Sequence, residues 1–196
     1  MPTTVAQRAT ILVLLAVALS ASRLHHFAAV PDASWAVFFV AGFYLRDWAR
    51  VAFPGLMALA VLVDVLVVTS QGTPFWQSYC VSPAYAFLLP AYYALWAGGQ
   101  WLGRGYRGLA ASEAGRLLLA LPLAVVACHL VAQGSFYWIS ANVSAPTLAG
   151  WWDNFAVWLV PYLRVAVGYV ALVAVVHVAV VRAAPLLAPR RHRRAG

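Results

Sequence analysis

Two long stretches without any Asp, Glu, Lys or Arg constrain most strongly what this chain can fold into. They run from Val65 to Gly103 and from Leu117 to Trp152. A helix needs roughly 20 apolar residues to cross the hydrocarbon core of a bilayer, so each stretch is long enough for one crossing and a loop. Of the whole chain, 64% is hydrophobic and 9% is charged, which is too little charge for the surface of a soluble domain. The sequence therefore predicts an integral membrane protein.

The apolar runs are typical of helices and not of a transmembrane barrel. In a bilayer every backbone polar group must be paired within the protein, which restricts spanning segments to helices and closed barrels. Barrel strands alternate apolar and polar residues, whereas the runs from Ala58 to Val68 and from Leu117 to Ala127 do not alternate. We therefore predict an all-α polytopic protein.

Six membrane helices fit the interruptions of the apolar pattern best. We predict them at about 8–24, 32–45, 51–69, 83–102, 113–133 and 153–182, in a single transmembrane domain over 1–196. The second is short for a full crossing. The first is predicted to be retained, because no convincing cleavage site and polar mature domain follow it.

The basic residues predict the orientation. All thirteen are Arg, and the net charge is +8. Arginine is enriched on the cytoplasmic side of membrane proteins, and the segments 71–82 and 134–152 contain none. We therefore expect both termini in the cytoplasm, these two segments outside, and 183–196 as a basic cytoplasmic tail. The expected surroundings of the chain are membrane lipid and not nucleic acid.

The predicted outer segment between the third and fourth helices carries the chemistry of greatest interest. It holds Trp76, Tyr79, Cys80 and Tyr85 without any charge. One interpretation is an interfacial aromatic belt with an incidental cysteine. The other is a substrate pocket with a thiol at its centre, since thiolate is a soft metal ligand and a nucleophile. Cys128, inside the fifth helix, is expected to be a small buried hydrophobe.

Ionisable residues inside apolar runs are functional candidates, because an unpaired charge in lipid is costly. Asp64 lies in such a run, and the structural alternative for it is an ion pair with Arg23 or Arg164. Arg164 is also a candidate to meet an anionic ligand group. His25 and His26 precede Asp32, but their spacing with Cys80 is not diagnostic of zinc. His129 and His177 are expected to be core histidines.

Several blocks of the sequence together resemble a known family. They are Ser22–Phe27, Pro31–Tyr44, Asp64, and Tyr79–Tyr85 continuing to Pro90. The chain resembles the BtuM family of small bacterial cobalamin transporters, which are similar to the substrate-binding S-components of energy-coupling-factor (ECF) transporters. The resemblance implies an S-component-like helical bundle in the bacterial inner membrane that takes up cobalamin from the outer side.

The resemblance also implies a site and a chemical step. Cys80 would ligate the cobalt of cobalamin, displace the dimethylbenzimidazole base and assist decyanation of cyanocobalamin. The residues expected to contact cobalamin are Cys80, Tyr85, Asp64, His25, Asp32, Trp35, Phe39 and Tyr79. No P-loop is present, so an ATP-driven step needs other subunits; whether the chain works alone or with an ECF-type energising module stays open. The rival hypotheses are an S-component-like binder of another vitamin and a membrane thiol oxidoreductase.

Overall fold

The computed structural model describes residues 4–24, 31–78 and 81–187, and within these ranges the chain is helical without any strand. Cys80, Tyr79 and His25 of the predicted site therefore lie outside the described residues. The helices are α1 (Val5–Leu24), α2 (Ser34–Tyr44), α3 (Ala49–Ser70), α4 (Leu88–Arg104), α5 (Ala111–Ile139) and α6 (Leu148–Leu187). Three 3₁₀ turns join them: η1 (Arg46–Trp48), η2 (Phe75–Gln77) and η3 (Pro83–Phe87).

Four helical segments are long and apolar enough to cross a membrane. They are Val5–Leu24, Arg46–Ser70, Ala111–Ile139 and Leu148–Ala184. α2 has 11 residues and α4 has 17, so each falls short of this length on its own. The all-helical fold is thus confirmed over the described chain, together with four helices of membrane-spanning length.

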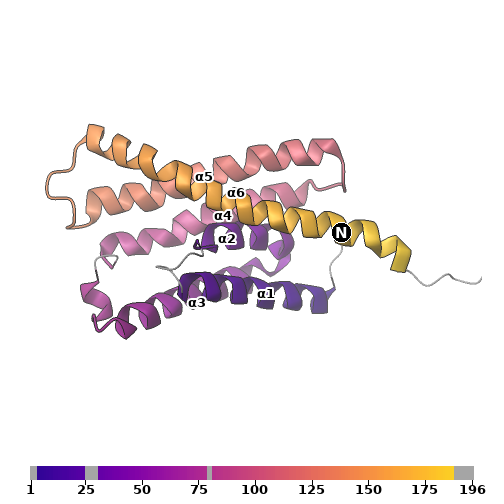
Figure 1. The fold of residues 1–196 in the computed structure, drawn as a ribbon, viewed down its shortest axis with the longest axis horizontal. Helices are drawn as coiled ribbons and strands as arrows, with labels where there is room; N and C mark the ends of the chain where they lie inside the picture. Colours follow the sequence, from indigo (N-terminus) through magenta and orange to yellow (C-terminus); the bar gives the residue numbers. More distant parts are fainter. Residues whose placement is uncertain (1–3, 25–30, 79–80, 188–196) are drawn as a thin grey trace, which may run out of the picture.

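Successive helices run in opposite directions between two ends of the bundle (Figure 1). We call the end with residues 71–78 and 140–147 the loop end. The other is the terminal end, because α1 begins there and α6 finishes there.

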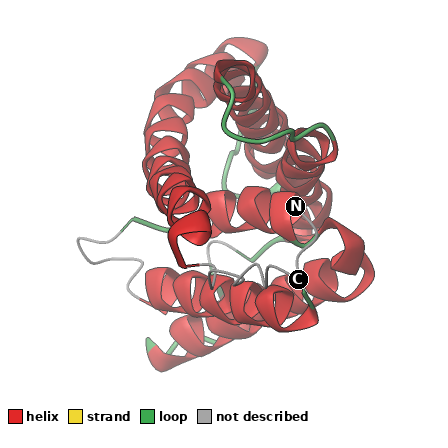
Figure 2. Ribbon diagram, turned by 90° about the vertical axis from the view of Figure 1, so that its right-hand side faces the viewer, coloured by secondary structure: helices red, strands yellow, loops and turns green. Residues whose placement is uncertain are grey.

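The short helix α2 forms the centre of the molecule. It packs against α1, α3, α4, α5 and α6, and every residue from Ser34 to Gly42 is buried. A helix that is apolar on all sides is expected to be enclosed by other elements in this way. Figure 2 shows the bundle from the terminal end, with its helices in red. α2 therefore sets the positions of the remaining helices.

Glycines let α2 and α4 approach each other closely. A methyl group on Gly99 would overlap the carbonyl oxygen of Phe39, and one on Gly42 would overlap that of Trp96. Small residues at helix interfaces permit such backbone contact in membrane proteins. The contact fixes the height of α2 relative to α4.

The last two helices extend further toward the loop end than the apolar pattern indicates. We expected 113–133 and 153–182, whereas the helices cover Ala111–Ile139 and Leu148–Leu187. Aromatic side chains of the added turns pack together: Phe155 contacts the rings of Trp151 and Trp152, and Thr147 N donates to the Tyr137 hydroxyl over 3.2 Å. This packing continues both helices, so the connecting loop is only 140–147.

Candidate functional site

A buried arginine organises the loop end of the bundle. Arg23, in the last turn of α1, is 8% exposed. Its Nε donates to Asp64 Oδ1 and its Nη2 to Asp64 Oδ2, each over 2.8 Å. Such two-pronged pairing of a guanidinium with a carboxylate is short and charge-assisted, and therefore among the stronger polar contacts. It ties the end of α1 to α3.

The remaining nitrogen of the same guanidinium contacts α2 and α4. Arg23 Nη1 donates to the Ser34 hydroxyl over 2.6 Å and to the Tyr92 hydroxyl over 3.1 Å. Asp32 Oδ2 lies 3.7 Å from the same nitrogen. Asp32 Oδ1 accepts from the Ser34 amide over 2.8 Å and also from its hydroxyl. The first turn of α2 is thereby held to Arg23.

Tyr85 connects this network to the segment that carries Cys80. The Tyr85 hydroxyl donates to Asp64 Oδ2 over 2.7 Å, so Asp64 binds Arg23 and Tyr85 at once. Tyr85 lies in η3, which packs against α4 and α5. The described chain five residues beyond Cys80 is therefore anchored on a charged cluster within the bundle.

The charges in this cluster do not balance. One guanidinium faces two carboxylates, Asp32 and Asp64, whose side chains are 22% and 23% exposed. Counting described residues alone, the cluster holds one more carboxylate than guanidinium. Each carboxylate keeps part of its surface exposed, and a charged group in membrane surroundings is stable only where it is paired or reaches water. The cluster can hold a polar or cationic group of a ligand.

Four side chains at the loop end have buried polar atoms that are not hydrogen-bonded to described residues. They are Ser82, Gln133, Ser140 and Trp151, and Gln133 is unpaired at both its oxygen and its nitrogen. A buried polar atom without a partner is destabilising by about 1–3 kcal/mol. Groups of this kind in a native fold indicate a bound molecule or water that completes their hydrogen bonds.

The predicted site residues separate into groups in the structure. Asp64, Asp32 and Tyr85 come together around Arg23. Trp35 lies one residue beyond Ser34 but points toward α6, where its ring stacks on Tyr162 with centroids 4.6 Å apart. Phe39 lies in the core, a turn further along α2, and is 2% exposed.

Three residues at the loop end were not expected from the sequence as site residues. Ser34 and Tyr92 belong to the Arg23 cluster and carry no charge, whereas Gln133, which ends the fifth predicted helix, is one of the unpaired side chains at the loop end. The spacing of seven between Tyr85 and Tyr92 is a signal that was available, because it places both residues on one face of the helix predicted over 83–102.

Two further candidates, Cys128 and Arg164, lie away from the Arg23 cluster. Cys128 in α5 is fully buried. Arg164 in α6 is exposed, while Ala166, two residues on and therefore on the opposite side of the helix, is buried. Arg164 thus points away from the bundle and does not pair with Asp64. Among the described residues, no group of three His, Cys, Asp or Glu is arranged to hold a metal ion.

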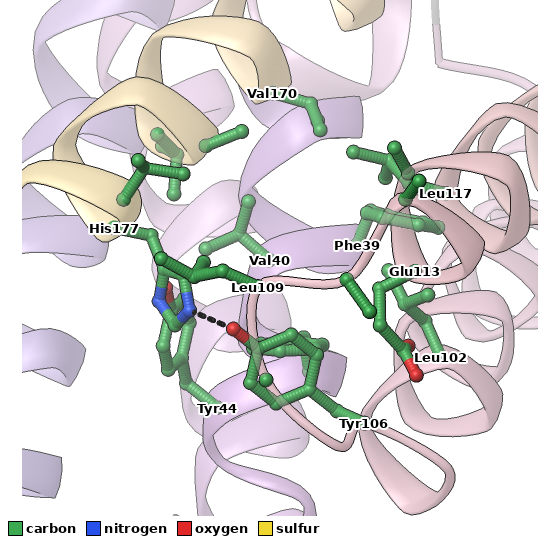
Figure 3. A pocket seen from close by; sticks show the side chains of 18 of the residues that line it. Phe39, Val40, Tyr44, Leu102, Tyr106, Leu109, Glu113, Leu117, Val170 and His177 are labelled. Atoms are coloured by element: carbon green, nitrogen blue, oxygen red, sulfur yellow. Dashed lines mark hydrogen bonds between the residues drawn. The ribbon is translucent and has the colours of Figure 1, made fainter. Parts of the chain in front are cut away.

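A well-defined cavity lies far from this cluster, at the terminal end. It has a volume of about 360 Å³ and lies between α2, the α4–α5 connection, α5 and α6 (Figure 3). Phe39 lines its inner wall. Such a space holds about a dozen groups the size of a water molecule.

No family model matches this chain, and no curated protein matches it either.

Proposed function

We propose that this protein is a bacterial inner-membrane transporter that binds cobalamin at the loop end, with Cys80 as a ligand to cobalt. The proposal rests on the sequence resemblance to the BtuM family and on the surroundings of the Cys80 segment. It treats Asp64, Asp32 and Tyr85 as the part of the site that lies among described residues.

The contact between Tyr85 and Asp64 is the observation that carries the proposal. A thiol can hold cobalt in a fixed direction only if the chain beside it is anchored. The 2.7 Å bond from Tyr85 to Asp64, which Arg23 holds in turn, supplies that anchor five residues from Cys80. The resemblance independently selects the same three elements: the Cys80 block, Asp64 and the end of the first helix.

The unpaired polar atoms at the loop end support a large polar cargo. Cobalamin carries amide groups around its corrin ring, and these can both donate and accept hydrogen bonds. Gln133, Ser140, Ser82 and Trp151 offer donors and acceptors that the described residues leave unused. A small apolar substrate would leave them unsatisfied.

The same proposal includes six crossings, with the terminal end in the cytoplasm. Arg8, Arg46, Arg104, Arg116 and Arg182 lie at or near the terminal end, whereas 71–78 and 140–147 contain no Arg. Apart from Arg23, whose charge is paired with Asp64 at the loop end, this arginine distribution supports a cytoplasmic terminal end. The five residues of η3 extend the 17 of α4 to a length that can cross. The 11 residues of α2 are too few to span the hydrocarbon core, but the chain passes between the two ends of the bundle through α2, which other helices enclose.

Cysteine accessibility tests this topology. Gly72 and Gly108 have positive φ angles of 78° and 121°, where a side chain would strain the backbone, so their neighbours are better positions for probes. In a cysteine-free background, Gln71→Cys and Ser144→Cys should react with an impermeant thiol reagent in whole cells, and Arg107→Cys should not. Labelling of Arg107→Cys in sealed cells would contradict the orientation.

The proposed chemical step is a ligand exchange on cobalt(III). The Cys80 thiol loses its proton, and its sulfur takes the place of the dimethylbenzimidazole nitrogen on the face opposite cyanide, so a cobalt–sulfur bond forms as the cobalt–nitrogen bond breaks. Electron donation from sulfur weakens the cobalt–cyanide bond, and cyanide leaves with its electron pair and takes up a proton. The products are the thiolate-bound cobalamin and hydrogen cyanide. Cobalt does not change oxidation state, so the exchange needs no reductant.

Absorption spectroscopy of purified protein with cyanocobalamin tests the ligand and the step together. The wild type should show a sulfur-bound, base-off spectrum and release cyanide. Cys80→Ala and Cys80→Ser should do neither, while Cys128→Ala, a change at a buried thiol in α5, should behave as the wild type. An unchanged spectrum in Cys80→Ala would rule out the proposed ligand. Binding with intact cyanide in the wild type would rule out the chemical step alone.

A further inference from the structure

The cavity at the terminal end has apolar walls and an internally satisfied polar floor. Its walls include Val40, Leu117, Val170 and Val173. On the floor, His177 binds the Tyr44 hydroxyl through Nδ1 and the Tyr106 hydroxyl through Nε2, each over 2.6 Å (Figure 3). Both imidazole nitrogens are therefore occupied by protein groups, and a ligand needs to supply no hydrogen bond there.

The two charged residues that line the cavity, Glu113 and Arg182, differ in whether another residue compensates their charge. Glu113 accepts from Arg116 Nη1 over 2.9 Å, so its charge is compensated within α5. Arg182, further along α6, also lines the cavity and is exposed. It makes no hydrogen bond or ion pair with any other residue that the structure describes. Over the part of the chain that the structure describes, the cavity thus offers an apolar interior and one available cation.

This end of the molecule is basic as a whole. The arginines of the described chain here are Arg8, Arg46, Arg50, Arg104, Arg107, Arg116 and Arg182. The acids that accompany them are Asp47, which pairs with Arg8 over 2.8 Å, and Glu113. Basic pockets between transmembrane helices on the cytoplasmic side are a recognised setting for anionic lipid headgroups.

We infer that this cavity is a binding site for an anionic phospholipid, with one acyl chain between α5 and α6 and the phosphate on Arg182. The volume of about 360 Å³ accommodates about a dozen methylene groups. An apolar chain suits walls that present no unsatisfied polar group, and a phosphate suits a free guanidinium. The inference rests on the membrane location in the proposed function, but not on cobalamin binding.

Native mass spectrometry with defined lipids tests the site, using two matched substitutions on α6. Ala174 lines the cavity, whereas Ala171, almost one turn earlier, is exposed and outside it. The wild type should retain phosphatidylglycerol in preference to phosphatidylcholine. Ala174→Phe should lose this retention and Ala171→Phe should keep it. Arg182→Gln should weaken the binding of phosphatidylglycerol about five-fold and leave the binding of phosphatidylcholine unchanged.

A measurement on the unmodified protein removes any dependence on the folding of the variants. A phosphatidylglycerol with a photoreactive acyl chain should crosslink to 109–117 and 170–178, and excess unlabelled phosphatidylglycerol should compete. Inorganic phosphate should not compete, which separates a lipid site from a phosphate site. Crosslinks spread evenly over the exposed faces of α1 and α3, or equal behaviour of Ala174→Phe and Ala171→Phe, would overturn the inference. Cobalamin spectra recorded on the same samples test the proposed function separately, so a failure of lipid binding can be told apart from a failure of cobalamin binding.

Discussion

Replacing Arg23 with methionine should destabilise the bundle more than most changes at a single position. Methionine keeps a stem of similar length but removes the charge that faces Asp64 and Asp32. Two 2.8 Å charge-assisted bonds to Asp64 are lost, with those to Ser34 and Tyr92. Removing one partner of a buried ion pair is destabilising by about 3–5 kcal/mol.

The structure places the expected value at the lower end of this range. The side chains of Asp64 and Asp32 retain 23% and 22% of their exposure, so water relieves part of the uncompensated charge. We therefore expect about 3 kcal/mol, which in a chain of this size corresponds to about 6–12 °C in melting temperature. The assay is thermal unfolding in detergent, followed by fluorescence of the nine tryptophans.

Arg164→Met is the matched control, because it removes the same group from an exposed position on α6. Its melting temperature should stay within about 2 °C of the wild type, as is usual for surface changes. A second test combines Arg23→Met with Asp64→Leu, where the double variant should be more stable than the sum of the two effects predicts. The hydrogen-bonded network around Arg23 would be refuted if Arg23→Met melted at the wild-type temperature. It would also be refuted if the effects of Arg23→Met and Asp64→Leu were strictly additive in the double variant.

Two other changes probe the anchor and the helix packing. Tyr85→Phe removes the hydrogen bond to Asp64, so cobalamin affinity should fall about ten-fold in a spectral titration; an affinity equal to the wild type would show that the anchor is not used. Gly99→Ala places a methyl group against the Phe39 carbonyl and should lower the melting temperature by at least several degrees. Gly55→Ala, which has no atom nearby, should leave it unchanged or raise it slightly. Equal effects of the two alanines would contradict the close contact of α2 with α4.

The depth of Asp64 in an apolar run marked it as a functional candidate, with an ion pair as the structural alternative. The sequence allowed either Arg23 or Arg164 as its partner, because both lie in helices that pass the same depth. The choice depends on how each helix is rotated about its axis. α1 turns Arg23 into the bundle, whereas α6 turns Arg164 away from it.

The helix lengths show a similar division. α1 ends at Leu24, as the apolar pattern predicts, and α3 lies within two residues of its predicted bounds. The extensions of α5 and α6 could not be predicted from the apolar pattern. They depend on aromatic contacts between the end of α5 and the start of α6, and a pattern within one segment does not show such contacts. The enclosure of α2 was equally hidden, since an apolar helix can face lipid or other helices with the same composition.

What the sequence determined by itself is therefore the all-helical architecture, with helices long and apolar enough for a membrane. These follow from local composition, since transfer of a segment into lipid depends on its own residues. The tertiary structure decided which charges meet, which polar groups stay unpaired at the loop end, and where a cavity opens at the terminal end. Those outcomes depend on the rotation, tilt and relative height of helices far apart in the chain, which no local pattern specifies.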